Sequence, residues 1–165
     1  MFAAVRAREQ DEPEVVLRPL SEGGEVVEDY AHTGLTLRCH PMAFLRDELA
    51  ANRLLPCSAL GEAKDGSGIA IAGLVLMRQR PGTAKGVIFV TLEDETGIAN
   101  LVLWPRLYER QRRVALTSRL LAVRGHVQRE GGVVHLIARS LEDLSGLLTR
   151  IGGSEPIEVK SRNFR

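Results

Sequence analysis

The stretch from Ile69 to Arg139 reads IAIAGLVLMRQRPGTAKGVIFVTLEDETGIANLVLWPRLYERQRRVALTSRLLAVRGHVQREGGVVHLIAR, and it decides the fold. It contains five segments of β type, separated by turns, with one short helical run between the third and the fourth. The order of three strands, a helix and two strands is that of a five-stranded Greek-key barrel of the OB type, in a chain that is mainly β. Barrels of this type most often bind single-stranded nucleic acid or oligosaccharide. The expected strands are 69–77, 87–92, 98–104, 119–128 and 133–139, with the helix at 105–116.

The second and third expected strands alternate between two faces, which assigns each residue to the inside or the outside of the barrel. Phe89, Asn100 and Trp104 fall on the outer face. Gly73, inside the first strand, predicts the bend or bulge by which a long strand closes a small barrel. The residues expected in the core are Ile88, Val90, Leu92, Leu101 and Leu103.

Charge is distributed unevenly along the chain. The net charge of the whole chain is only +1, which by itself argues against a nucleic-acid-binding protein. Between Ile69 and Leu141, however, there are eleven Arg and Lys residues and only five Asp and Glu residues, a balance of +6. The rest of the chain must therefore sum to −5. A basic barrel with acidic flanking segments is the better description, and such local positive charge is typical of nucleic-acid-binding domains.

Six residues are candidate nucleic-acid contacts, because positive charge along a groove binds phosphates and exposed aromatic rings stack on bases. They comprise three basic residues expected in the loop between the first two strands, two residues of the outer face and one arginine of the fourth strand. The candidates are Arg78, Arg80, Lys85, Phe89, Asn100 and Arg124. The alternative is an ordinary solvated surface, with Phe89 packed under the first loop and Trp104 capping the bottom of the barrel.

Nothing in the chain has the pattern of a catalytic or cofactor-binding site: there is no Walker loop, GxGxxG, nucleophile elbow or HExxH. The carboxylates at 93–95 occupy a hairpin turn and are expected to be solvated. The spacing of His32, Cys39, His40 and Cys57 fits no standard zinc site, so buried cysteine and a helix-flanking histidine are expected. We therefore expect no catalytic residue, no metal and no cofactor.

The chain is expected to divide into four parts. A helix begins at Pro41, a favoured first helical position, and Met42, Leu45 and Leu49 share one of its faces. The polar segment 61–68 is the best boundary before the barrel. The parts are an acidic N-terminal arm (1–30), a helical connector (31–61), the OB barrel (62–145) and a flexible C-terminal tail (146–165).

Two isolated cysteines are too few for a disulfide framework, which favours a reducing compartment. No apolar run has the length of a membrane span, and the N-terminus shows no secretory signal. A cytoplasmic location without membrane association is expected.

The run from Gly73 to Gly97, GLVLMRQRPGTAKGVIFVTLEDETG, resembles the OB domain of bacterial error-prone DNA polymerases. These enzymes belong to the family of the replicative DNA polymerase III alpha subunit. The resemblance extends over nearly the whole chain, from the segment before the OB domain to the family's C-terminal end. Further similar motifs are ANLVLWP (99–105), LAVRG (121–125), LEDL (141–144), GLTLRCHP (34–41) and SRNFR (161–165).

The resemblance implies an accessory domain that contacts single-stranded template DNA in translesion synthesis after DNA damage, beside other subunits of a translesion polymerase complex. Family members are several times longer than this chain, and no position here matches their catalytic palm or PHP domain. Catalysis is therefore not expected of this chain alone.

Two alternatives remain open at this stage. The chain could be a protein-interaction module that docks onto partners of a mutagenesis complex, using Val87, Phe89, Val102 and Trp104 as an exposed apolar patch. It could also be a gene remnant without an independent role.

Overall fold

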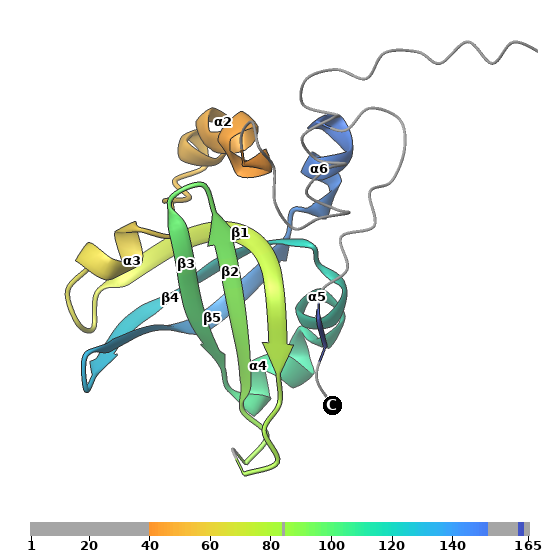
Figure 1. Ribbon diagram of the computed structural model, residues 1–165. Helices are drawn as coiled ribbons and strands as arrows, with labels where there is room; N and C mark the ends of the chain where they lie inside the picture. The colour runs from red at the N-terminus through yellow and green to blue at the C-terminus, as the bar shows by residue number, and fades with distance from the viewer. Residues whose placement is uncertain (1–39, 84, 152–161, 164–165) are drawn as a thin grey trace, which may run out of the picture.

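Five strands close into a barrel in the computed structural model, which describes residues 40–83, 85–151 and 162–163 (Figure 1). The strands are β1 (Gly68–Gln79), β2 (Ile88–Asp94), β3 (Gly97–Leu103), β4 (Leu120–Glu130) and β5 (Val133–Asp143). Around the barrel the order is β1, β2, β3, β5, β4 and back to β1. Within this barrel only the pairing of β3 with β5 is parallel. The order confirms the predicted OB-type barrel and the mainly β class.

β1 is the strand that closes the barrel, because its first half pairs with β4 and its second half with β2. Leu74 pairs with both neighbouring strands. At the preceding Gly73, a Cβ would lie 2.9 Å from the carbonyl oxygen of Glu93, so only glycine permits this close approach of β1 to β2. The predicted bend is present here, and β1 curves across the barrel in Figure 1. A register shift follows between Val75 and Met77.

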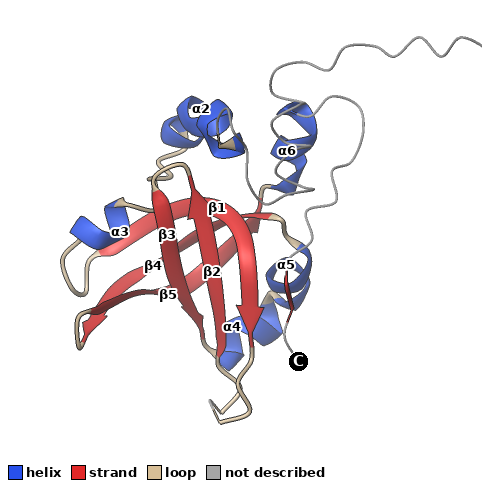
Figure 2. Cartoon of the chain, in the orientation of Figure 1, coloured by secondary structure: helices blue, strands red, loops and turns tan. Residues whose placement is uncertain are grey.

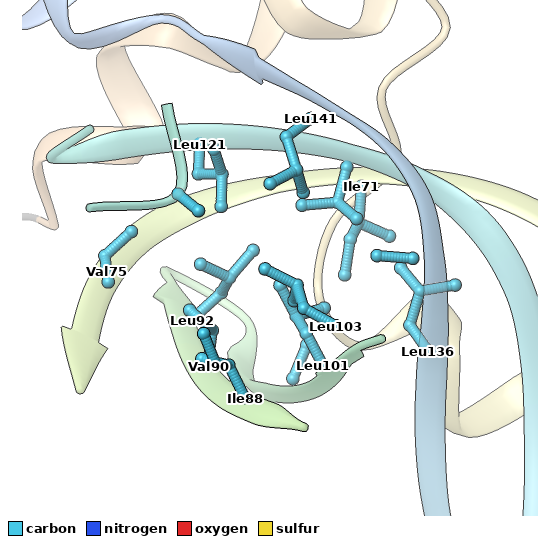
Figure 3. Close-up of a cluster of buried hydrophobic side chains, with 14 of the residues drawn as sticks. Ile71, Val75, Ile88, Val90, Leu92, Leu101, Leu103, Leu121, Leu136 and Leu141 are labelled. Atoms are coloured by element: carbon cyan, nitrogen blue, oxygen red, sulfur yellow. The ribbon is translucent and has the colours of Figure 1, made fainter. Parts of the chain in front are cut away.

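The barrel interior is filled by apolar side chains from all five strands (Figure 3). Ile71 of β1, Leu121 of β4 and Leu136 of β5 are among those that meet at its centre. The predicted alternation of β2 and β3 is confirmed, because all five residues expected in the core are buried. These residues are Ile88, Val90, Leu92, Leu101 and Leu103.

Two short helices, α4 (Pro105–Arg110) and α5 (Arg112–Thr117), stand where one helix was expected. They are separated at Gln111, whose side-chain amide donates to the carbonyl oxygen of Leu141 at 2.8 Å and accepts from its backbone N–H at 2.9 Å. Leu107, Tyr108 and Ala115 join the core of the barrel. The helices therefore close one end of the barrel and are fixed to β5.

A second apolar cluster lies on the outer side of β1 and β4, and the helices at this end of the barrel are seen in Figure 2. The cluster is built by the short 3₁₀ helix η1 (Pro41–Leu45), by α2 (Arg46–Ala51) and by α6 (Ser145–Ile151). The predicted helix face is confirmed. Among the described residues, no helix is long and apolar enough to cross a bilayer. The buried members of the cluster are Met42, Leu45, Leu49, Leu54, Ala72, Leu74, Leu120, Ala122 and Leu148.

Two expectations about organisation need correction. The polar segment 61–68 is no break in packing, because Leu60 of α3 (Ala59–Glu62) is buried in the barrel core and the N–H of Gly66 donates to the carbonyl of Val127 at 2.8 Å. The predicted tail from residue 146 is wrong in its first six residues, since α6 continues to Ile151 and buries Leu148. A short strand, β6 (Arg162–Asn163), also pairs in parallel with β1. The expected acidic arm, 1–30, lies outside the described residues.

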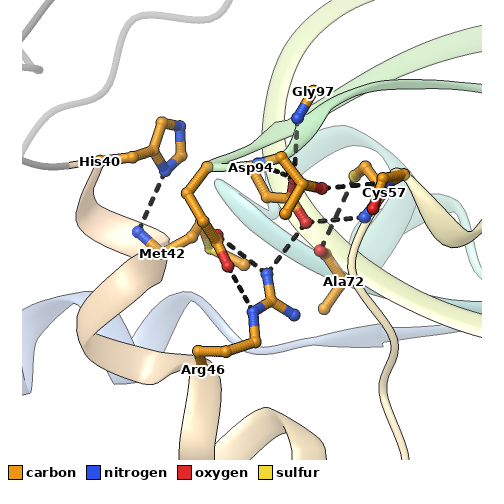
Figure 4. A network of polar contacts seen from close by, with 10 residues as sticks. His40, Met42, Arg46, Cys57, Ala72, Asp94 and Gly97 are labelled. Atoms are coloured by element: carbon orange, nitrogen blue, oxygen red, sulfur yellow. Dashed lines mark hydrogen bonds and ion pairs between the residues drawn. The ribbon is translucent and has the colours of Figure 1, made fainter.

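Asp94 joins the helical segment to the turn between β2 and β3 (Figure 4). Its buried carboxylate accepts from the backbone N–H of Cys57 at 2.7 Å and pairs with the Arg46 guanidinium at 2.9 Å. The hydroxyl and N–H of Thr96 also donate to it, at 2.6 and 2.8 Å. Burial raises the pKa of Asp94, but these hydrogen bonds and the Arg46 charge outweigh it and hold the pKa below its usual value. The prediction of a solvated turn is wrong for this carboxylate.

Candidate nucleic-acid interface

The sides of β2, β3 and β5 that point away from the barrel interior are called the outer face below. This face carries a row of apolar side chains across the three strands. Phe89 of β2 pairs with Val102 of β3, and Val102 pairs with Ile137 of β5. Together with Val87 these residues form a small cluster, in which Phe89 is only partly buried. The ring of Phe89 is therefore held by its neighbours while part of it faces solvent.

A row of polar side chains runs parallel to the apolar row. Thr91 pairs with Asn100, and Asn100 pairs with His135 of β5, which pairs with Gln128 of β4. The hydroxyl of Thr91 lies 3.4 Å from Oδ1 of Asn100 and donates to it. Asn100 alone was predicted from sequence. His135 and Gln128 were missed because the strand register, not sequence distance, places them beside it. The only sequence signal was their outward position in alternating strands.

The loop between β1 and β2 lies at one end of the outer face, near the start of α4 (Figure 1). Arg80 and Lys85 are both exposed there, as predicted. The Arg80 guanidinium stands over the ring of Tyr108, 5.7 Å from its centroid. A Cβ on Gly86 would lie 3.5 Å from Cγ of Pro105, so the loop ends against α4. These contacts fix the loop base and leave two cations accessible to solvent.

Arg78 does not belong to this loop, which corrects its predicted position. It lies in β1 with only 7% of its surface exposed. Its Nε donates to the carbonyl of Ala115 at 2.7 Å, and its Nη2 donates to the carbonyl of Ser118. Burial lowers the pKa of the guanidinium. Because the guanidinium uses its N–H groups in hydrogen bonds to these carbonyls, Arg78 attaches β1 to the end of α5. It is therefore not part of the candidate interface.

Arg124 is exposed on β4, between Ala70 of β1 and Ser140 of β5. Ala70 lies in the first half of β1, whereas the loop follows the end of that strand. The fold therefore does not bring Arg124 together with Arg80 and Lys85.

The two other aromatic residues near the loop differ in exposure, and Trp104 lies on the outside of the barrel, as its outer-face position predicted. Trp104, which could have capped the bottom of the barrel, is 54% exposed. Tyr108 is buried in the core instead, with Arg80 and Arg112 near its ring. An exposed Trp next to exposed cations has the chemistry of a base-stacking surface.

Within the described ranges, no group of three or more His, Cys, Asp and Glu residues could hold a metal ion. Cys57 is buried, as predicted, and burial is the main cause that raises the pKa of its thiol. His40 flanks η1, as predicted, and its Nδ1 accepts from the N–H of Met42 at 3.1 Å. Cys39 and His32 lie outside the described residues.

Comparison with known protein families places the barrel in a class. Residues 69–144 match the family model of the OB-fold nucleic acid binding domain. The match covers all five barrel strands except the first residue of β1, and it includes the outer face and the loop. The barrel is therefore an OB-fold nucleic-acid-binding domain.

Sequence relatives give the particular family. The chain is 58% identical over 160 residues to error-prone DNA polymerase 2 of Rhizobium meliloti (strain 1021), covering 94% of this chain and 15% of that polymerase. It is 55% identical over 151 residues to error-prone DNA polymerase 2 of Agrobacterium fabrum (strain C58), covering 88% of this chain and 14% of the polymerase. The chain belongs to the family of the bacterial error-prone DNA polymerases and spans about 15% of their length.

Proposed function

We propose that this chain binds single-stranded DNA as an accessory domain in error-prone DNA synthesis after DNA damage. The observation that carries the proposal is the position of Arg80 and Lys85 at the end of a face that combines a partly exposed ring with a polar row. DNA is the proposed nucleic acid because the relatives are DNA polymerases. The relatives' polymerase activity is not part of the proposal, since the chain spans a small part of their length.

Each group on the interface has a chemical task in this proposal. The ring of Phe89 stacks on a base, which requires an unpaired base and therefore a single strand. Asn100 and His135 offer hydrogen bonds to base edges or sugars. Arg80 and Lys85 contact successive phosphates where the strand leaves the sheet. The strand would thus cross β2, β3 and β5 and pass the loop.

The composition of the outer face supports nucleic acid over a protein partner. The protein-docking alternative requires Val87 and Val102 to be exposed together with Phe89 and Trp104. Both valines are buried, at 9% and 8% exposure, so the four residues do not form a continuous apolar patch. The same face also carries the polar side chains of Thr91, Asn100 and His135 beside the partly exposed ring of Phe89, a combination that suits a nucleic-acid interface.

The double variant Arg80→Ala/Lys85→Ala is expected to weaken binding and to reduce its dependence on salt. Each phosphate contact with a single strand contributes about 0.7 to the slope of log K against log salt, so losing two contacts should flatten the slope by about 1.4. The measurement is fluorescence anisotropy of a labelled 12-nucleotide DNA, titrated with protein at several salt concentrations.

The control is Lys64→Ala/Arg124→Ala, which removes the same charge from two exposed residues outside the proposed interface. It should leave the salt slope close to that of the wild type. An equal flattening in both double variants would mean that net charge, not the loop, determines binding. Absence of wild-type binding at low salt, or binding that salt does not weaken, would refute the proposed function.

A further inference from the structure

The outward side of β3 ends in an exposed large apolar residue at each end. Ile98 is 59% exposed and Trp104 is 54% exposed. They stand six positions apart along the chain, with Asn100 and Val102 between them on the same side of the extended backbone. Trp104 itself keeps an extended backbone, with φ −69° and ψ 150°, before α4 begins. The outer face therefore continues to Trp104.

The two ends differ in charge. Ile98 pairs with Glu93, beside the turn that carries Asp94 and Glu95, so three carboxylates lie here against the single guanidinium of Arg46, which pairs with Asp94 and Glu95. In Figure 1 that turn lies toward α2, at the opposite end of the barrel from the loop and α4. Phosphates are repelled from an acidic end, so a single strand that crosses the sheet should not extend past Ile98.

The Trp104 end is basic. Arg80 and Lys85 of the loop lie at this end, and in 105–117 the only acidic residue is Glu109. Arg106, directly after Pro105 in α4, is exposed. The arginines of the two helices are Arg106, Arg110, Arg112 and Arg113, all of them exposed. An exposed ring among cations suits a nucleotide, whose base stacks while its phosphates are neutralised.

The register places Trp104 where the outer face meets the loop. Leu103 pairs with Ile88, so Trp104 comes next to Val87, the residue that precedes β2. A Cβ on Gly86 would lie 3.5 Å from Pro105 and 3.8 Å from Nη2 of Arg80, which puts the loop cation beside the start of α4. The ring and the cations thus belong to one surface.

We propose that Trp104 stacks on a nucleobase of single-stranded DNA where the strand leaves the sheet, and that Arg106 contacts a neighbouring phosphate. This site extends the interface from the sheet onto α4. It rests on the proposed function, because it concerns the same ligand on an adjoining surface.

Trp104 is the single tryptophan of the chain, so intrinsic fluorescence reports on this site directly. Titration of the full chain with an unlabelled 12-nucleotide DNA should quench the emission with the same midpoint as the anisotropy titration. Heparin, a polyanion without bases, should bind the basic end of the barrel without quenching the emission of Trp104, because it has no base to stack on the ring. Binding by anisotropy with unchanged emission would overturn the inference while leaving the proposed function intact. Absence of any binding would overturn both.

Substitution gives a second and independent test. Trp104→Ala should weaken binding about 5-fold to 160-fold, the range for loss of one base–aromatic stack. Trp104→Phe keeps a ring and should recover most of the affinity. The matched control is Ile98→Ala, which removes the equally exposed residue at the acidic end and should leave the affinity unchanged. Far-UV circular dichroism checks that each variant is folded. Equal affinity of Trp104→Ala and wild type, or an equal loss in Ile98→Ala, would contradict the site.

Discussion

Replacing Gly125 with alanine is expected to destabilise the barrel by at least about 3 kcal/mol, the upper part of the range for overpacking. Gly125 lies in β4 beside the register shift with β5. A Cβ there would lie 2.1 Å from the carbonyl oxygen of Ile137 and 3.1 Å from Cδ1 of Leu136. The first of these neighbours is backbone within the sheet, so it cannot move away without breaking the pairing of β4 with β5. Urea unfolding followed by circular dichroism measures the free energy of unfolding.

The matched control is Gly146→Ala in α6. Nothing lies within 4 Å of a Cβ at that position, and it is exposed. Alanine is favoured over glycine by about 0.8–1.0 kcal/mol in a helix interior and by less in the first turn, where Gly146 lies, so this variant should be slightly more stable than wild type. The two substitutions add the same methyl group with opposite expected signs. If Gly125→Ala had the same midpoint of urea unfolding as the wild type, the close packing of β4 on β5 would be wrong.

Replacing Asp94 with alanine is expected to cost about 3 kcal/mol, because it removes a buried acceptor of several N–H groups and one of the two carboxylates that pair with Arg46. The carboxylate also accepts from the N–H groups of Cys57, Thr96 and Gly97. These donors would lose their acceptor at the point where the helical segment meets the turn. Glu95→Ala is the control, since Glu95 also contacts Arg46 but is exposed, and its loss should cost less than about 1 kcal/mol.

The contribution of Asp94 to the free energy of unfolding should also depend on pH. Its pKa in the folded chain lies below the ordinary value of 3.8, so the folded state favours the charged form. This stabilisation is complete above the ordinary pKa and is lost as pH falls through the lower, folded-state pKa. Wild type and Asp94→Ala should therefore converge in stability under strongly acidic conditions. A difference in unfolding free energy that stayed constant from neutral to acidic pH would show that the charge of Asp94 contributes nothing.

The strand faces could be predicted from the sequence because alternation in β2 and β3 is regular. In β1 the position of Arg78 was predicted wrongly, because the strand was expected to end at Met77 and Arg78 to lie in the loop after it. Val75 faces the core, and an uninterrupted strand would have turned Arg78 outward. The bulge between Val75 and Met77 shifts the alternation by one residue, so that Arg78 pairs with the buried Val90. A bulge depends on the register of the neighbouring strand, which a single sequence does not specify.

The packing of the helical segment on the barrel also escaped prediction. β1 and β4 each carry apolar residues on both faces over part of their length, as in Ala72 and Leu74 of β1 and Leu120 and Ala122 of β4. Such two-sided apolar strands indicate that both faces are covered, and this signal was available. The partner of Asp94 was not, because Arg46 lies 48 residues away and only the folded chain brings them together.

The candidate interface was predicted in part. Arg80, Lys85, Phe89 and Asn100 lie around one face, whereas Arg124 lies elsewhere. The location of the loop and the alternation of the strands sufficed for the residues of β2 and β3. Residues contributed by β5 required the three-dimensional register.

The most direct test of the account is an NMR titration of the ¹⁵N-labelled 18.1 kDa chain with a single-stranded 12-nucleotide DNA. The account predicts that the largest amide shift changes fall at Lys85, Phe89 and Asn100, with a change at the indole N–H of Trp104. The resonances of η1, α2 and α6 should stay in place. Shift changes confined to those three helices, or no changes at low salt, would contradict the claim that the outer face and its loop bind single-stranded DNA.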